Sequence, residues 1–171
     1  RLRIDIKGAI YMKKISIIIP AYNEQESLPM LYERLTKLMN SMENYQFEVL
    51  FVNDGSKDKT LELLEKIAEN DKCVKIVSFS RNFGHQAAVT AGLQYVTGDA
   101  IVIMDADLQD PPELIPELVK YWEQGYDDVY AKRRSRKGET WLKKFTSKMY
   151  YRVLQHVTKQ MPFYLKCFII L

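Results

Sequence analysis

The sequence predicts an α/β protein with a doubly wound, mostly parallel sheet flanked by helices. Two observations lead to this prediction. Short runs rich in isoleucine and valine alternate along the chain with amphipathic segments, and several runs are apolar at almost every position. Continuous apolar runs of this kind are typical of parallel strands that are covered on both faces. The alternation over 171 residues favours one domain of β-α units with right-handed crossovers.

Five apolar runs are the expected strands. They are short and mostly rich in isoleucine and valine, and turn-forming residues follow most of them. In chain order they span Ile15–Ile19, Phe47–Val52, Val74–Phe79, Ala100–Met104 and Asp128–Ala131.

Four segments between these runs have the helical spacing of apolar residues. Ser27 and Asp58 precede the first two, and we expect them to cap these helices. The third helix is expected over Gly84–Val96. The fourth is expected over Pro112–Gln124, with Gly125 as its C-terminal cap.

The charge of the chain is unevenly distributed. Residues 1–131 carry 14 basic and 21 acidic groups, whereas residues 132–171 carry 11 basic groups and one acid, Glu139. A basic tail behind a mildly acidic body indicates contact with an anionic partner, or else a solvated basic surface. The ordinary content of charged and apolar residues disfavours a disordered chain, a collagen-like chain and a disulfide scaffold.

Several functional classes are disfavoured because their motifs are missing. The chain has no P-loop, no Rossmann glycine motif after the first strand, no zinc-ligand spacing and no Ser/His/Asp arrangement. Cys73 and Cys167 lie far apart and form no metal-type or redox-type pair. We expect both to be idle thiols of a reducing compartment.

Polar residues follow four consecutive predicted strands where each strand ends. In parallel α/β sheets, ligands bind beyond the carboxyl ends of the strands. Each polar segment combines turn-forming residues with charged or amide groups, so together they predict a binding site. The segments are Pro20–Glu24, Asn53–Ser56, Ser80–His85 and Asp105–Asp110.

Asp105 and Asp107 are the sharpest candidates for chemistry. They follow a buried strand, and residues two apart on an extended backbone point the same way. Their oxygens suit Mg²⁺ or Mn²⁺ that also binds a diphosphate, and Gln109 would add a third oxygen ligand. The alternative interpretation is a pair of turn aspartates before two prolines.

The remaining segments are candidates for nucleotide binding. Asp54 lies in a natural turn, Asn53–Ser56, and its carboxylate could accept hydrogen bonds from a base or ribose. The alternative interpretation is an aspartate that only stabilises the turn. Tyr22 can pack on a nucleobase, and Arg81 can pair with phosphate. His85 is expected to be a helix-start or surface residue, and His156 receives no functional role.

The basic tail predicts an amphipathic helix. After Lys132–Gly138, Thr140 can cap a helix that reaches about Val157, with an aromatic-bearing apolar face beside lysines. This pattern is typical of a helix at a membrane interface, and an ordinary helix packed on the sheet is the alternative. Nucleic acid is disfavoured because no nucleic-acid module is present. No run is long enough to cross a bilayer.

Taken together, the four polar segments resemble family 2 glycosyltransferases of the GT-A fold. Within that family they resemble polyprenyl-phosphate sugar transferases of the dolichyl-phosphate mannosyltransferase and bactoprenol glucosyltransferase type. The resemblance covers about residues 13–157, and its most specific part is Asp105–Glu113, with its glutamine and paired prolines.

The resemblance implies a hexosyltransferase with a UDP- or GDP-sugar donor, a Mg²⁺ or Mn²⁺ cofactor and a polyprenyl phosphate acceptor. It implies inverting transfer at the cytoplasmic face of the cell membrane. Asp105 and Asp107 would be the catalytic residues and, with Gln109, the metal ligands. Arg133 and Arg136 would meet the acceptor phosphate. The implied nucleotide-binding residues are Pro20, Ala21, Tyr22, Asn23, Glu24, Asp54, Arg81, Asp105 and Ala106.

We expect three segments: a leader over residues 1–12, a nucleotide-sugar-binding domain over 13–137, and a basic helix with a divergent or truncated tail over 138–171. The apolar end from Met161 departs from the family pattern. Two alternatives stay open, a soluble family 2 enzyme acting on a polysaccharide and a non-catalytic nucleotide-binding fragment. An exposed amphipathic helix could also pair with a second copy of the chain.

Overall fold

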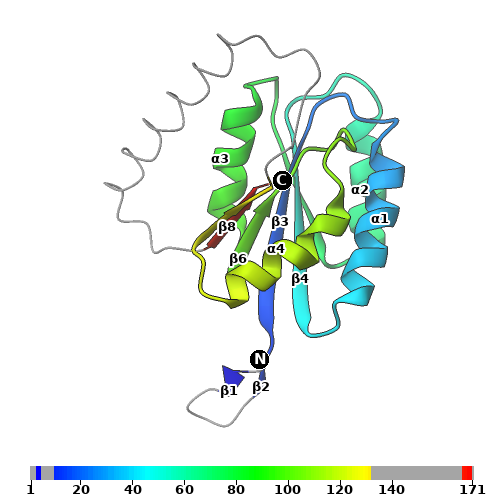
Figure 1. The fold of residues 1–171 in the computed structure, drawn as a ribbon. Helices are drawn as coiled ribbons and strands as arrows, with labels where there is room; N and C mark the ends of the chain where they lie inside the picture. The colour runs from blue at the N-terminus through cyan, green and yellow to red at the C-terminus, as the bar shows by residue number, and fades with distance from the viewer. Residues whose placement is uncertain (1–2, 5–9, 132–166, 171) are drawn as a thin grey trace. The chain divides into compact units, whose positions relative to one another are not determined.

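The described residues build a six-stranded sheet in which every pairing is parallel (Figure 1). The structure, a computed structural model, describes residues 3–4, 10–131 and 167–170. The strand order is β5-β4-β3-β6-β8-β7. The strands are β3 (Lys13–Ala21), β4 (Tyr45–Asn53), β5 (Val74–Ser78), β6 (Ala100–Ile103), β7 (Asp128–Tyr130) and β8 (Cys167–Ile170). A separate antiparallel pair consists of β1 (Arg3–Ile4) and β2 (Ile10–Tyr11).

Helices cover both faces of the sheet. Helices α1, α2 and α4 pack on one face, while α3 packs on the other. The helices are α1 (Leu28–Ser41), α2 (Thr60–Asn70), α3 (His85–Tyr95) and α4 (Ile115–Glu123), with a short 3-10 helix, η1 (Pro112–Leu114), before α4. The arrangement confirms the doubly wound α/β prediction, and every predicted strand and helix in the described ranges is present.

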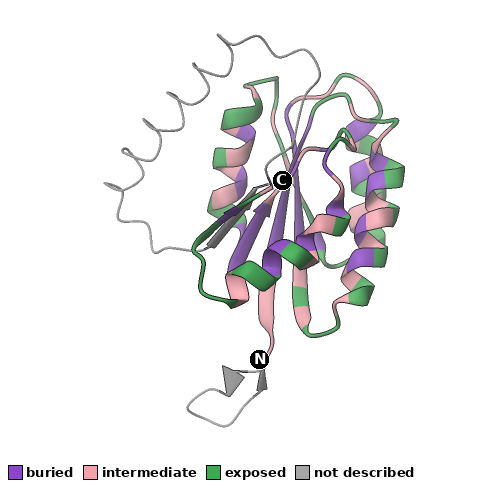
Figure 2. Cartoon of the chain, viewed as in Figure 1, coloured by how far each residue is buried: buried purple, intermediate pink, exposed green. Residues whose placement is uncertain are grey.

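The core lies on both sides of β3 and β4 (Figure 2). Ile15, Ile17 and Ile19 face the larger cluster with α1, whereas Ile18 faces the cluster under α3. Every residue of β3 from Ile15 to Ala21 is buried. This explains why the run is apolar almost throughout instead of alternating, since a strand between two helical layers has no solvent face.

The caps of the first two helices differ from the prediction. Ser27 stands at the N-cap position of α1, but its backbone is helical and its hydroxyl donates back to Glu24 Oε2 (2.6 Å), so it caps nothing. Asp58 does hold the start of α2, because its Oδ1 accepts from Thr60 N (3.0 Å). The predicted C-cap of α4 is confirmed, since Gly125 has a φ of +97°.

Strand β8 was not predicted. It inserts between β6 and β7, where Ala100 pairs with Cys167 and Asp128 with Phe168. These residues were predicted to lie in a divergent tail, because the strand comes long after its neighbours in the chain and its pairing is non-local. The predicted basic helix, with His156, and the basic segment before it, with Arg133 and Arg136, lie outside the described residues.

Glu48 forms a buried polar cluster near the amino-terminal ends of the strands. Only 2% of the residue is exposed. Its carboxylate accepts hydrogen bonds from Lys75 Nζ (2.6 Å), Ser16 Oγ (2.7 Å) and Thr97 N (2.9 Å). Burial alone would raise the pKa of Glu48, but these hydrogen bonds and Lys14 outweigh it and lower the pKa to about 2. The carboxylate is therefore fully engaged in the fold.

Within the described ranges, none of the helices has the length and apolar content that a bilayer crossing requires.

Candidate active site

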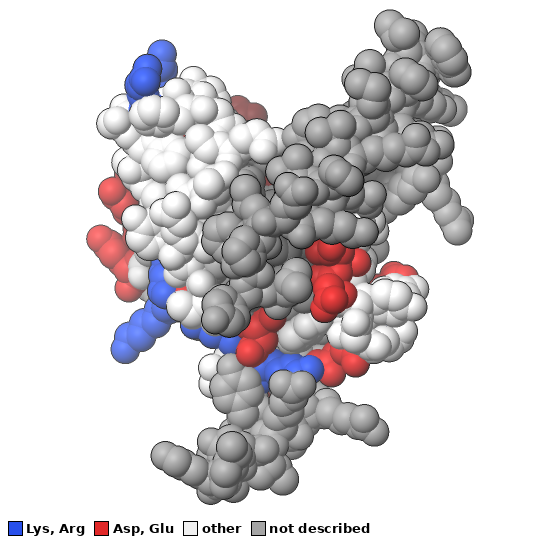
Figure 3. Space-filling view, turned by 90° about the vertical axis from the view of Figure 1, so that its left-hand side faces the viewer, with Lys and Arg blue, Asp and Glu red and all other residues white. Residues whose placement is uncertain are grey.

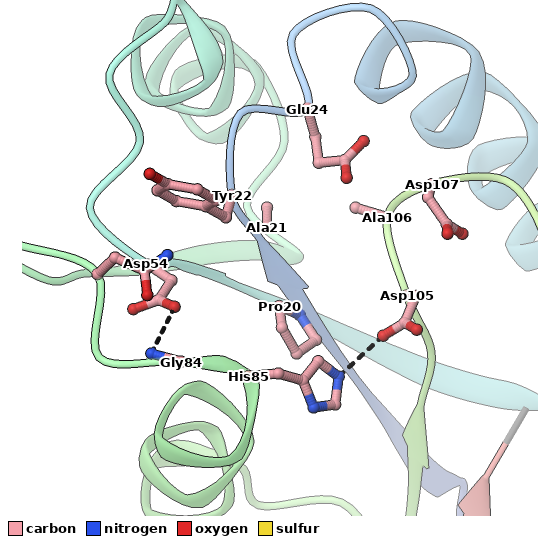
Figure 4. A pocket seen from close by; sticks show the side chains of 11 residues that line it. Pro20, Ala21, Tyr22, Glu24, Asp54, Gly84, His85, Asp105, Ala106 and Asp107 are labelled. Atoms are coloured by element: carbon pink, nitrogen blue, oxygen red, sulfur yellow. Dashed lines mark hydrogen bonds and ion pairs between the residues drawn. The ribbon is translucent and has the colours of Figure 1, made fainter. Parts of the chain in front are cut away.

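A cavity of about 290 Å³ opens beyond the carboxyl ends of β3, β4 and β6, beside the start of α3 (Figure 4). It lies where the sequence predicted a binding site, and all four polar segments contribute to its wall. The lining residues are Pro20, Ala21, Tyr22, Glu24, Asp54, Asn82, Gly84, His85, Asp105, Ala106 and Asp107.

Pro20 reaches the cavity because the pairing of β3 with β6 ends before it. The last paired residues are Ile18 and Ile103, and Ile18 directs its carbonyl oxygen toward Met104 N (3.2 Å). In a strand, the backbone hydrogen-bonding groups of residues two apart point to the same side. The backbone nitrogen of Pro20 therefore points past the end of β6, where no partner strand follows. Proline therefore removes no hydrogen bond from the sheet at this position, and the chain can turn into the cavity wall.

The loops after β3 and β4 are joined to each other by a series of hydrogen bonds. Asn23 is central, since its N–H donates to Ser56 Oγ (3.0 Å) and its Oδ1 accepts from Lys57 N (2.8 Å). Its φ of +58° is one that asparagine tolerates. The other bonds join Glu24 N to Thr60 Oγ1, Gln25 N to Asp58 Oδ2, Lys59 N to Gln25 Oε1 and Asp54 N to Ala21 O.

Asp54 connects this pair of loops to the segment before α3. It is 4% exposed, and its two carboxylate oxygens accept from Phe83 N (2.7 Å) and Gly84 N (2.9 Å). Gly55 allows the close approach, because an added Cβ would lie 2.3 Å from the carbonyl carbon of Arg81. The carboxylate of Asp54 therefore joins two loops, while its own turn is closed by Ser56 N, which donates to Asn53 Oδ1 (3.2 Å). A role of Asp54 in binding nucleotide stays a prediction.

Asp105 and Asp107 both line the cavity, but not for the predicted reason. Strand β6 ends at Ile103, and a turn follows at Ala106 and Asp107. The two carboxylates therefore do not share an extended backbone. Instead, Asp107 Oδ1 accepts from Gln109 N (3.0 Å), and Leu108 between them has a φ of +63°. A branched side chain in the left-handed region is strained, and such strain is common at functional sites.

Three predicted ligand-binding residues in the described part of the chain, Asn23, Arg81 and Gln109, lie outside the cavity lining. Gln109 does not line the cavity, so the geometry adds no support for its predicted place beside the metal. The Arg81 guanidinium lies over the ring of Phe83, 4.6 Å from its centroid, and Arg81 does not line the cavity either. Their binding roles stay predictions.

His85 lies closer to the predicted site chemistry than its helix-start position indicates. It begins α3, as predicted, but it also lines the cavity, with Nε2 2.9 Å from Asp105 Oδ1. The signal was present in the sequence, because His85 ends the third polar segment at the same sheet edge as Asp105. A lone histidine at a helix start gave no further reason to choose it.

The residues at this edge fit a divalent ion that is shared with a substrate. Among the described residues, no group of three or more His, Cys, Asp or Glu side chains is placed to hold a metal by itself. Asp105 and Asp107 supply hard oxygen donors from one loop. Mg²⁺ is commonly held by one or two carboxylates, with water and substrate phosphates completing the shell. The pair suits that arrangement and not a closed structural metal site.

The parallel sheet with helices on both faces is of the α/β class, and solved structures match it as a GT-A fold. A Pyrobaculum calidifontis mannosyltransferase, PcManGT, solved with GDP-Man and Mn²⁺, has a TM-score of 0.59 at 23% identity over 72% of this chain and 36% of that one. Staphylococcus aureus TarS, solved with UDP-GlcNAc, has a TM-score of 0.58 at 23% identity over 74% and 36%. These likenesses confirm the predicted fold.

The chain belongs to glycosyl transferase family 2, whose sequence profile matches residues 16–170. Curated relatives agree. YkcC of Bacillus subtilis, described as an uncharacterized glycosyltransferase, is 54% identical over 84% of this chain and 44% of its own length. A prophage bactoprenol glucosyl transferase homolog of Escherichia coli is 42% identical over 82% and 45%. The chain thus spans less than half the length of these relatives. The resemblance seen in the sequence is confirmed.

Proposed function

We propose that this chain is the catalytic domain of a metal-dependent, inverting glycosyltransferase that moves a hexose from a UDP- or GDP-sugar to a polyprenyl phosphate at a membrane surface. The observation that carries the proposal is the edge cavity, which Asp105 and Asp107 line together with residues of the loops after β3 and β4. Relatives named bactoprenol glucosyl transferases, at 41–42% identity, support the lipid-linked acceptor.

The cavity offers a separate place for each part of the donor. Tyr22 and the hydrogen-bonded loops after β3 and β4 form the wall at which we place the nucleoside. The carboxylates of Asp105 and Asp107 lie on another wall, where the diphosphate would sit. A divalent ion bound there neutralises charge on the leaving diphosphate.

The reaction needs little acid–base chemistry from the protein. A phosphate monoester is already anionic near neutral pH, so its oxygen can attack the anomeric carbon without a strong general base. As that bond forms, the bond from the anomeric carbon to the diphosphate oxygen breaks, and the nucleoside diphosphate leaves with the electron pair. Attack from the opposite side inverts the configuration. The work left to the chain is positioning.

The acceptor side of the proposal rests on the sequence. Residues 132–171 carry 11 of the 25 basic groups, and Arg133 and Arg136 are the proposed contacts of the acceptor phosphate. On the face shown in Figure 3, the described residues carry acidic and basic side chains without a continuous basic patch. A peripheral position at the inner face of the cell membrane follows from the acceptor and the basic tail.

The direct test is a label-transfer assay with this chain. Radiolabelled UDP-glucose or GDP-mannose, Mn²⁺ and a short polyprenyl phosphate in phosphatidylglycerol vesicles should give labelled lipid, and excess EDTA should abolish it. Flotation of the same vesicles should carry the chain with them.

Three results would contradict the proposal in different parts. Transfer that continues unchanged in excess EDTA would show that the reaction does not depend on a metal ion. Label in a soluble polysaccharide, without vesicle binding, would favour the soluble family 2 alternative. Binding of nucleotide without transfer to either acceptor would favour a non-catalytic fragment.

A further inference from the structure

His85 lines the cavity but has no role in the proposed function. Its side chain extends from the first residue of α3 toward Asp105 (Figure 4), and both side chains are about half exposed. Its Nε2 is 2.9 Å from Asp105 Oδ1. This contact joins the acidic loop, Asp105–Asp110, to α3.

The direction of this hydrogen bond follows from its acceptor. An ionised carboxylate has no proton to donate, so the proton between the two atoms belongs to Nε2 of His85. The imidazole is therefore a donor to Asp105 whether it is neutral or charged. One carboxylate oxygen is held in this way, and the second oxygen of Asp105 has no hydrogen-bond partner in the described part of the chain.

His85 is itself fixed by the fold. Gly84, immediately before it, has a φ of +95°, and its N–H is held by the buried carboxylate of Asp54 (2.9 Å). Asp54 N in turn donates to Ala21 O (2.9 Å). The chain of contacts runs from the end of β3 through Asp54 and Gly84 to His85 and then to Asp105, so it crosses all four loops of the cavity.

We infer that His85 is a positioning residue for Asp105, which orients this carboxylate toward a divalent ion. The inference rests on the proposed function, because it assumes the ion at Asp105 and Asp107. Carboxylates that bind metals are commonly held by a hydrogen bond from a neighbouring group, and loss of that partner typically costs 10–100-fold in metal affinity. His85 supplies that bond from a rigid helix.

The test compares variants of the full chain by Mn²⁺ titration in the presence of UDP or GDP, followed by electron paramagnetic resonance of free Mn²⁺. His85→Phe keeps a ring but removes the donor, and Mn²⁺ affinity should fall by about 10-fold or more. His85→Gln keeps an N–H donor and should stay within about threefold of the unmodified chain. Gln86→Ala, at the next and exposed position of α3, is the matched control and should not change.

Nucleotide affinity in the absence of metal distinguishes positioning of Asp105 by His85 from direct contact of His85 with the phosphates of the nucleotide. It should be equal in all variants, since a positioning residue acts on the ion. An equal fall of nucleotide affinity with and without metal in His85→Phe would mean direct contact with the phosphates and would overturn the inference. Unchanged Mn²⁺ affinity in His85→Phe, with a thermal midpoint like that of His85→Gln, would also overturn it.

The proposed function fails in a different way. If the unmodified chain binds no Mn²⁺ with either nucleotide, the proposed metal site is wrong, and the inference falls with it. Sugar transfer to lipid is then judged by the label assay alone.

Discussion

The two ends of the central sheet hold acidic side chains in opposite states. At the amino-terminal end, Glu48 is 2% exposed, and Lys75, Ser16 and Thr97 occupy its oxygens. At the carboxyl-terminal end, the side chain of Asp105 is 50% exposed, and a single hydrogen bond from His85 reaches it. Both residues belong to or follow strands of the same sheet, so the difference comes from their partners.

This contrast teaches which acidic residues of a fold are available for chemistry. The oxygens of the Glu48 carboxylate already accept hydrogen bonds from the fold, so they are not available to a ligand. The same hydrogen bonds lower the pKa of Glu48. A carboxylate at the rim of a cavity keeps an oxygen for a ligand. Asp54 falls between the two states, because it lines the cavity but is buried and bonded to two backbone amides.

The largest expected effect is a loss of activity when the acidic residues at the carboxyl ends of the strands are replaced. Asp105→Asn or Asp107→Asn should lower sugar transfer by about a thousandfold, since metal stabilisation of a leaving group is worth several kcal/mol. The unfolding free energy should change by less than about 0.5 kcal/mol, because both residues lie at an open rim. Initial rates and urea denaturation measure the two quantities, and Asp127→Asn, an exposed residue outside the cavity, is the control. Activity within tenfold of the unmodified chain would contradict the assignment.

At the amino-terminal ends of the strands, we expect a loss of stability without a loss of metal binding. Glu48→Gln should lower the unfolding free energy by about 3 kcal/mol, because it weakens charge-assisted hydrogen bonds in a buried site. Mn²⁺ affinity should not change, since the cavity lies at the other end of the strands. A stability loss below about 1 kcal/mol in urea denaturation would show that the cluster is not a structural anchor.

The same carboxylate gives a pH dependence of stability. The pKa of Glu48 is about 2 in the folded protein, against an ordinary value of 4.5. Because the unfolded chain binds this proton more readily, the contribution is complete above about pH 4.5 and is lost as pH falls toward 2. The stability difference between the unmodified chain and Glu48→Gln should therefore shrink from pH 6 to pH 3. Urea denaturation at both pH values measures it, and a constant difference would contradict the assigned pKa.

A smaller effect is expected where the loops of the cavity meet. Gly55→Ala should cost about 2 kcal/mol more in unfolding free energy than Gly125→Ala. Both glycines have positive φ, so alanine is strained at either position. Only the Cβ at position 55 would meet backbone atoms, those of Arg81 and Asn82, while nothing lies within 4 Å at position 125. Equal losses in thermal or urea denaturation would mean that the loop from Ser80 to Gly84 shifts freely.

The sequence predicted the fold well because its signals are local. The apolar run from Ile15 and the helical spacing after Leu28 each specify one element, and parallel topology follows from their alternation. Strand β8 was missed because its place in the sheet depends on pairing with β6 and β7, which no local pattern reports. The cap at Ser27 failed because its backbone is already helical.

The candidate site was predicted in location but not in detail. Strand ends located Asp105, Asp107 and Tyr22 correctly at the cavity, since parallel strands bring their carboxyl ends to one edge. The turn after β6 and the contact from His85 depend on how loops fold against one another. No spacing rule in the sequence reports such contacts, so the extended geometry expected at Asp105–Asp107 was wrong and His85 received too little weight.

The most direct test is a crystal structure of this chain with UDP or GDP and Mn²⁺, in which anomalous scattering locates the manganese. The account predicts a manganese peak in contact with the carboxylate of Asp105 or Asp107 and with the diphosphate, and the nucleoside against Tyr22. Bound nucleotide with no manganese at this edge, and both carboxylates turned to solvent, would contradict it.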